Sequence, residues 1–123
     1  LRVCLDEPAG KHGGAFIKYA RTAFDLAVVD AAACLWFEGR ECTRARVVVG
    51  ATRTVPWRAT EAEAILAGKK PTASVLDKAA RAAREATGTA DDIRTSGDYR
   101  RQMVEVIVRR TLAQAVERAG EVG

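Results

Sequence analysis

Aromatic residues are scarce in this sequence. They make up 6% of its 123 residues, although the hydrophobic share as a whole reaches 48%. A core of this composition must be close-packed from small side chains, with few large ones among them. We expect these large members to be Phe24, Trp36, Phe37 and Trp57. A chain of this length suits one domain, residues 1–123, that needs neither disulfides nor metal to fold.

Cysteine and histidine are too few for several kinds of site. The three cysteines, Cys4, Cys34 and Cys42, are odd in number and lack the paired short spacings of zinc or iron–sulfur ligands. His12 is the only histidine, and no nucleophile motif accompanies it. We therefore expect no catalytic residue and no bound metal, and we expect free thiols in a reducing cytoplasm.

Long apolar runs are also missing. None approaches the ~18 residues of a membrane span, and the first residues do not form a secretory signal. The sequence begins without methionine, so we expect that it was cut from a longer chain or processed. The net charge is +4, but 20 basic residues are interleaved with 16 acidic ones and no aromatic–basic stacking motif is present. We expect neither a membrane nor a nucleic-acid partner.

The first half of the chain is predicted to form strands. Residues 15–21 alternate well enough for a short strand, whereas 11–14 lack the glycine and lysine spacing of a phosphate-binding loop. Residues 24–37 are apolar at almost every position, so periodicity leaves helix and strand open. The turn at 38–41 and the β-branched run that follows favour an antiparallel hairpin over 25–50. Asp30 is the one charged residue inside the first strand of this hairpin. It either faces solvent, faces a partner or sits at an irregularity of the strand.

Two helices are predicted in the middle of the chain. Pro56 ends the strand region, and Thr60 with Glu63 matches a capping box for a helix over 58–67. Gly68 ends that helix. A second helix over 73–87 is capped by Thr72 or Ser74 and stops near Gly88.

The third predicted helix, 97–118, has the clearest pattern. Its apolar residues recur every three or four positions, and Ser96 stands where it can cap the first turn. We expect Ile107 to be buried at its centre. Four arginines fall mostly off the apolar stripe and favour a solvated basic face over a binding face: Arg100, Arg101, Arg109 and Arg110. Strands followed by helices predict an α+β fold, a small antiparallel sheet packed on a three-helix cluster.

Several segments, taken in order, resemble one known domain. They comprise Phe16, Lys18, Arg21, Asp25, Leu26 and Ala27; then Gly50, Pro56, Arg58, Ala59, Glu63, Leu66, Gly68 and Lys69; then residues 92–101 and the pair Arg109 and Arg110. Over about residues 14–116 the chain resembles the C-terminal domain of the FAD-binding subunit of the molybdenum hydroxylases, the xanthine dehydrogenase and carbon monoxide dehydrogenase family. Between Lys18 and Asp25 it is one residue shorter than the family pattern.

The resemblance implies a place in an electron-transfer oxidoreductase. The domain would lie beside FAD, pack on the preceding FAD-binding domains and contact the molybdenum-cofactor and iron–sulfur subunits. FAD would be bound only in a composite site, because its phosphates are held by domains outside these residues, and no activity is expected of this chain alone. A second interpretation is a stand-alone α+β protein-interaction module of the same fold without flavin.

The resemblance also implies two cofactor-binding residues. Phe16 would form an apolar wall beside the isoalloxazine ring, and Lys18 would place a cation near the polar edge of that ring. The alternative is an aromatic residue packed in the core and an ordinary surface lysine.

Overall fold

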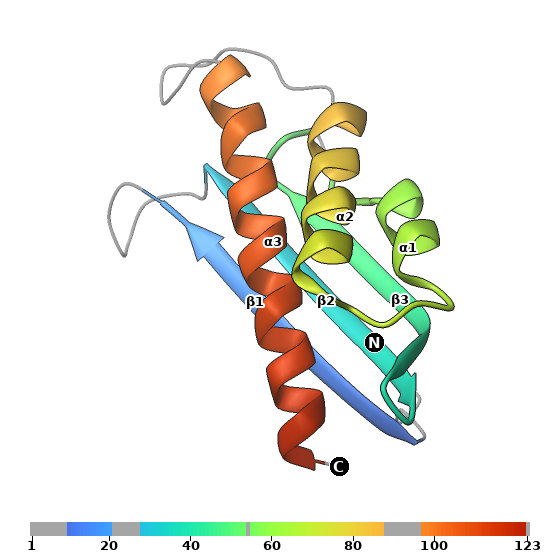
Figure 1. Ribbon diagram of the computed structural model, residues 1–123. Coiled ribbons are helices and arrows are strands. Elements are labelled where there is room, and N and C mark those ends of the chain that lie inside the picture. The colour runs from blue at the N-terminus through green and yellow to red at the C-terminus, as the bar shows by residue number, and fades with distance from the viewer. Residues whose placement is uncertain (1–9, 21–27, 54, 88–96, 123) are drawn as a thin grey trace, which may run out of the picture.

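The chain folds into one sheet with helices on one of its faces. The computed structural model describes residues 10–20, 28–53, 55–87 and 97–122 (Figure 1). Its elements are β1 (Lys11–Tyr19), β2 (Val29–Glu38), β3 (Glu41–Gly50), β4 (Trp57–Arg58), α1 (Thr60–Leu66), α2 (Ala73–Ala86) and α3 (Gly97–Val122). The predicted α+β class, an antiparallel sheet packed on three helices, is confirmed.

All four strands are antiparallel and follow one another in the order β1-β2-β3-β4. The predicted hairpin is confirmed for residues 29–50, and its turn is made by Gly39 and Arg40. Gly39 has a φ of 63°, a conformation that glycine adopts without strain. The strand predicted at 15–21 begins earlier, at Lys11, and ends at Tyr19. Residue 21 of the predicted strand and residues 25–27 of the predicted hairpin lie outside the residues that the structure describes.

The helices agree with their predicted positions, apart from two local corrections. Arg58, predicted to open the first helix, instead forms β4 together with Trp57, and the two residues pair with Val48 and Val49. The strand region therefore does not end at Pro56. The predicted capping box is wrong, because Ala59 is the N-cap and provides no side-chain hydrogen bond. In α2 the predicted cap is confirmed: the Thr72 hydroxyl accepts a hydrogen bond from the Val75 N–H at 3.3 Å.

The core is the layer between the sheet and the helices. Its largest fully buried side chains are aliphatic: Leu35, Leu66, Ile107, Leu112 and a group of valines. The predicted burial of Ile107 is confirmed. The aromatic core prediction is wrong for the described rings, since Phe37 and Trp57 only border the core and Trp36 is half-buried on the sheet; Phe24 lies outside the described residues.

Glycine allows α3 to lie directly on β1. A Cβ atom at Gly13 would be 2.1 Å from the Ala115 carbonyl oxygen and 2.5 Å from the Ala119 nitrogen, so no larger residue fits without a backbone shift. The contact between β1 and α3 is thus made by glycine and alanine, and no large side chain separates the two elements at this point. Residues 11–14 belong to a strand, which excludes them as a phosphate-binding loop.

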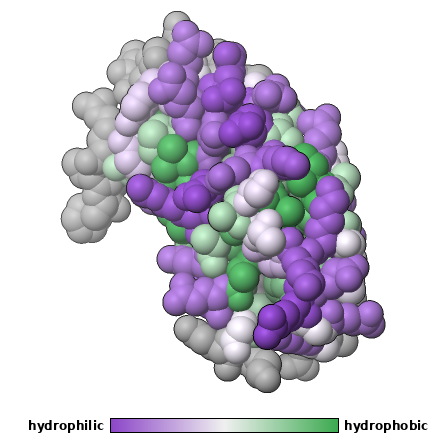
Figure 2. All heavy atoms as spheres, viewed as in Figure 1, coloured by the Kyte–Doolittle hydropathy of each residue, from purple (hydrophilic) through white to green (hydrophobic). Residues whose placement is uncertain are grey.

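The outer surface of the helices is largely hydrophilic, with smaller hydrophobic areas between the polar side chains (Figure 2). Arg101, Arg109 and Arg110 are exposed as predicted, and Arg109 forms an ion pair with Asp77 of α2. Arg100 is an exception to the predicted basic face, because its side chain is buried. No helix among the described residues combines the length and the apolarity needed to cross a membrane.

The opposite side of the sheet is a separate surface, which we call the open face. Strand register places four rows of side chains on it: His12–Trp36–Arg44, Gly14–Cys34–Arg46, Phe16–Ala32–Val48 and Lys18–Asp30–Gly50. The residues between them, such as Ala31, Ala33 and Leu35, are buried under the helices. This alternation of exposed and buried residues is that of a sheet covered on one side.

Candidate functional site

Phe16 and Lys18, the two residues implied to face a flavin, lie together on the open face. Both are exposed on β1, an edge strand, and the Phe16 side chain retains 59% of its accessible surface. Their neighbours Ala15 and Ile17 point to the core instead. Phe16 is therefore not a core aromatic but an exposed ring beside Lys18.

Asp30 is a third member of this cluster. Its Cα pairs with that of Lys18 across the strands, so the two side chains share the open face. The carboxylate lies over Gly50, where a Cβ atom would come within 2.2 Å of Asp30 Oδ1. Burial raises the pKa of Asp30, an effect that the charge of Lys18 partly opposes. Of the three placements left open by the sequence, the irregularity is wrong, because Asp30 pairs in regular register with Lys18 and Gly50 on the open face.

An arginine and a tryptophan continue the open face towards the hairpin turn. The Arg44 guanidinium stacks on the Trp36 ring, 4.6 Å from its centroid. Cys34 lies in the neighbouring row, and burial raises the pKa of its thiol despite the nearby charge of Arg44. Cys34 is accordingly a protonated thiol without the low pKa of a reactive cysteine.

Contacts with α3 hold β1 in place at both of its ends. Near its start, Gly13 fits against Ala115 and Ala119. At its end, the Tyr19 and Tyr99 hydroxyls form a hydrogen bond of 2.7 Å, which is the main cause of the raised pKa of Tyr99. Because Lys18 and Phe16 lie between these contacts, α3 fixes the strand that presents both residues.

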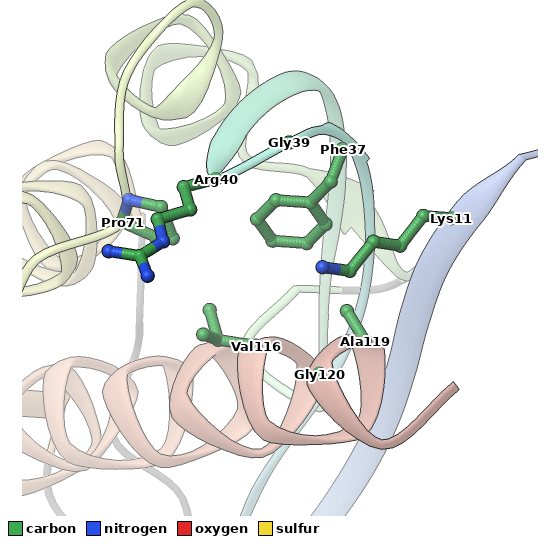
Figure 3. A pocket seen from close by; sticks show the side chains of 8 residues that line it. All are labelled: Lys11, Phe37, Gly39, Arg40, Pro71, Val116, Ala119 and Gly120. Atoms are coloured by element: carbon green, nitrogen blue, oxygen red, sulfur yellow. The ribbon is translucent and has the colours of Figure 1, made fainter. Parts of the chain in front are cut away.

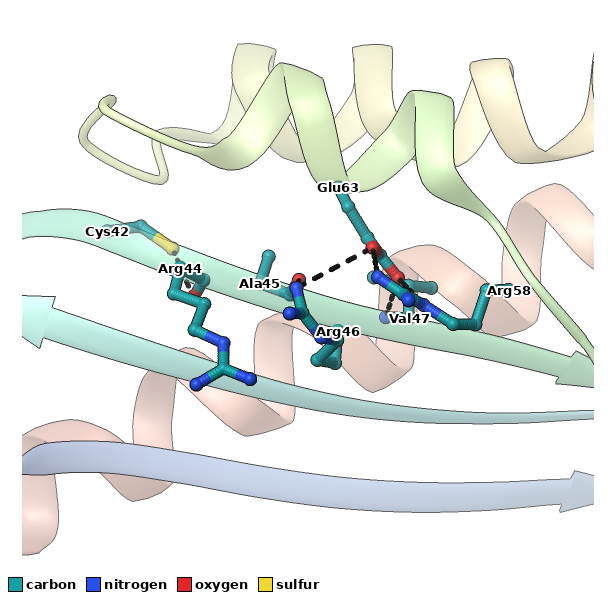
Figure 4. Close-up of polar contacts among 7 residues, drawn as sticks. All are labelled: Cys42, Arg44, Ala45, Arg46, Val47, Arg58 and Glu63. Atoms are coloured by element: carbon teal, nitrogen blue, oxygen red, sulfur yellow. Dashed lines mark hydrogen bonds and ion pairs between the residues drawn. The ribbon is translucent and has the colours of Figure 1, made fainter. Parts of the chain in front are cut away.

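The middle part of the family pattern has a structural role. Glu63 of α1 reaches down to β3, where its carboxylate accepts a hydrogen bond from the Val47 N–H at 3.0 Å (Figure 4). Arg58 donates to the same carboxylate through Nε at 3.2 Å, and Arg46 lies 3.9 Å away. Glu63 thus occupies the edge of β3 where β4 has ended. This contact with β3 explains why Glu63 does not complete the predicted capping box.

The charge of Glu63 is stabilised by these partners. Burial would raise the pKa of its carboxyl, but the hydrogen bonds from Arg58 and Val47 and the charges of Arg58 and Arg46 outweigh burial and lower it. Leu66 and Gly68 of the same segment are structural too. Leu66 is fully buried, and Gly68 has a φ of 77°.

Other sequence candidates form no site in the described residues. His12 Nδ1 lies 2.9 Å from the Gly10 carbonyl oxygen, which gives the ring a local partner. Within the described ranges, no three histidine, cysteine, aspartate or glutamate side chains are placed to hold a metal ion. The open-face cluster of Phe16, Lys18 and Asp30 is therefore the candidate site.

Comparison with known proteins identifies the fold. The family model of the CO dehydrogenase flavoprotein C-terminal domain matches residues 14–115. The chain belongs to this family. The resemblance expected from the sequence is confirmed, and so is the α+β architecture.

Three members illustrate the family. The carbon monoxide dehydrogenase medium chain of Afipia carboxidovorans is 34% identical over 91% of this chain and 39% of its own length. The 6-hydroxypseudooxynicotine dehydrogenase complex subunit alpha of Paenarthrobacter nicotinovorans is 32% identical over 87% of this chain and 36% of its own. Quinoline 2-oxidoreductase from Pseudomonas putida 86 superimposes with a TM-score of 0.84 and 33% identity, covering 91% of this chain and 39% of that one. The chain thus spans about two-fifths of these relatives.

Proposed function

We propose that this chain is the domain of a molybdenum hydroxylase's FAD-binding subunit that lies beside the flavin, in an electron-transfer oxidoreductase. Membership of a flavoprotein family supports a flavin in the complete protein. The observation that carries the placement is the exposure of Phe16, at 59%, next to Lys18 on a sheet face that no described helix covers.

The open-face residues fit the edge of a flavin ring. Phe16 offers a flat apolar surface for contact with an aromatic ring and shields that side from water. Lys18 offers a cation to the ring's polar edge, where it would stabilise the negative charge of a reduced flavin. Asp30 lies opposite Lys18 on the neighbouring strand, and its carboxylate interacts electrostatically with the Lys18 ammonium. When bound, the flavin would supply the redox chemistry, and these residues would position it.

The site is proposed to be composite. Dinucleotides take much of their affinity from a phosphate-binding loop at a helix N-terminus. Residues 11–14, the stretch considered as such a loop in the sequence, are part of β1. The preceding FAD-binding domains would therefore bind the phosphates, while the molybdenum-cofactor and iron–sulfur subunits would be further partners.

The substrate is proposed to be chosen elsewhere in the complex. The relatives are named for carbon monoxide, 6-hydroxypseudooxynicotine and quinoline, three dissimilar molecules, yet they share this domain. A domain common to such different enzymes is suited to the flavin step rather than to substrate recognition. The free thiols Cys34 and Cys42 support a reducing location, and we propose the cytoplasm.

Two titrations test the proposal. The purified chain is titrated with FAD while flavin fluorescence is followed, and no saturable micromolar binding is expected. The chain is then added to FAD-loaded FAD-binding domains, the partners that the proposal assigns to it. Association should change the flavin spectrum, and Phe16→Ala should weaken it about three- to tenfold, the range of one aromatic contact. Val106→Ala, an exposed truncation on α3, is the matched control.

The lysine is tested by the flavin potential. Lys18→Gln removes a positive charge beside the ring, so the potential for forming an anionic reduced flavin should fall. Lys78→Gln, the same change on the exposed side of α2, should leave it unchanged. Tight binding of FAD by the chain alone would show that the site is not composite. Co-purification with proteins other than flavin, molybdenum and iron–sulfur components would favour the interaction-module interpretation.

A further inference from the structure

A cavity lies at the other end of the molecule, between the hairpin turn, the last turns of α3 and the connection before α2 (Figure 3). Its volume is about 200 Å³. Phe37 and Pro71 provide apolar walls on one side, and Val116 and Ala119 face them from α3. Such a volume is below the ~300–1,000 Å³ typical of sites for drug-sized ligands, so an occupant must be small.

Two cations stand at this apolar cavity. The Lys11 ammonium lies 6.0 Å from the centroid of the Phe37 ring, and the exposed Arg40 side chain comes from the hairpin turn. Among the described residues, neither forms an ion pair with a carboxylate, and none of the lining residues is acidic. Glu38 and Glu41 flank the turn but do not line the cavity. An apolar interior beside two cations that have no carboxylate partner among the described residues is complementary to an apolar anion.

We propose that this cavity binds a small carboxylate with an apolar body, of which benzoate is the simplest aromatic example. The body would lie between Phe37 and Val116, where it is removed from water. The carboxylate would lie between Lys11 and Arg40, whose guanidinium can donate two parallel hydrogen bonds to it.

The cavity is separate from the proposed flavin site. Lys11 and Lys18 are at opposite ends of β1, about 24 Å apart at about 3.4 Å per strand residue. The cavity also lies on the helical side of the sheet, whereas Phe16 and Lys18 are on the open face. Binding here therefore requires no flavin, and its failure would leave the proposed function untouched.

The test is a titration of the purified chain with sodium benzoate, followed by amide nitrogen–proton NMR spectra. A ligand with so few atoms should bind with a Kd of about a millimolar. Shifts should be concentrated at Gly39, Arg40 and Gly120. Benzamide, which has the same shape without the charge, should bind about tenfold more weakly, and inorganic phosphate should leave these signals unshifted.

Variants identify the residues responsible. Lys11→Gln and Arg40→Gln should each weaken benzoate binding about threefold or more, whereas Lys78→Gln, an equal loss of charge on α2, should not. Val116→Phe, checked for folding by circular dichroism, should abolish binding by filling the cavity. Equal affinity for benzamide, absence of saturable shifts, or indifference to both cation variants would overturn the proposal. The proposal would also be overturned if the amide signals of Gly39, Arg40 and Gly120 shifted on addition of partner subunits but not on addition of benzoate. The cavity would then be a protein interface.

Discussion

Removal of the Glu63 carboxylate should destabilise the domain more than removal of the Glu61 carboxylate, the other acidic group on α1. Glu63→Ala deletes the acceptor of the Val47 N–H, which is inside the protein and would be left unpaired. An unsatisfied buried donor costs about 1–3 kcal/mol, and we take about 2 kcal/mol. For a domain of 123 residues, with about 2.1 cal/mol/K of unfolding entropy per residue, this corresponds to a Tm lowered by about 8 °C.

The assay is thermal and urea unfolding at neutral pH, followed by far-UV circular dichroism. Glu61→Ala is the matched control, because Glu61 is exposed on the same helix and loses the same atoms. Its effect should stay within about 0.5 kcal/mol. The loss of stability in Glu63→Gln should lie between those of Glu63→Ala and Glu61→Ala. Its amide oxygen can still accept a hydrogen bond from the Val47 N–H, but the negative charge opposite Arg58 is gone.

The pH dependence has a defined sign. The folded-state pKa of Glu63 is lowered, so its charge stabilises the fold above the unfolded pKa of about 4.3. That contribution is lost as the pH falls through the folded value. The stability difference between the wild type and Glu63→Gln should therefore persist at neutral pH and shrink in acid. Identical melting of Glu63→Ala and Glu61→Ala would refute the assigned role.

Two further predictions concern the core. Ile107→Ala should cost about 2–5 kcal/mol in the free energy of unfolding, whereas Arg101→Ala on the surface should change it little; equal small effects in urea unfolding would mean that α3 is not the packing centre. Gly13→Ala should cost about 1–3 kcal/mol because its Cβ would lie 2.1 Å from the Ala115 carbonyl oxygen, whereas Gly14→Ala meets its nearest atom at 3.5 Å and should be mild. Equal melting temperatures for the two glycine variants would contradict the close contact between β1 and α3.

Local patterns predicted the elements that are long and regular. In α3 the apolar spacing alone located the helix and the burial of Ile107. The hairpin was predictable from its turn and from the β-branched residues of β3, although β2 is apolar on both faces apart from Asp30 and its last residue, Glu38. Phe16 and Lys18 share a face because their spacing of two residues is the strand period.

Features that depend on distant partners were not predictable. The pairing of Trp57 and Arg58 with β3 exists only once the sheet has formed, so two residues after a proline gave no strand pattern. Glu63 has the spacing of a capping box, but the Val47 N–H and Arg58 compete for its carboxylate. The position of Asp30 was open because strand register, not sequence, brings it next to Lys18.

The contact between Gly13 and α3 also has a consequence for the order of assembly during synthesis. The β2–β3 hairpin closes over a two-residue turn, whereas Gly13 meets Ala115 only after about 100 further residues have been made. At about 5–20 residues per second, β1 leaves the ribosome several seconds before the helix that supports it. During that interval the side of β1 that α3 covers in the folded domain is exposed and can contact other chains.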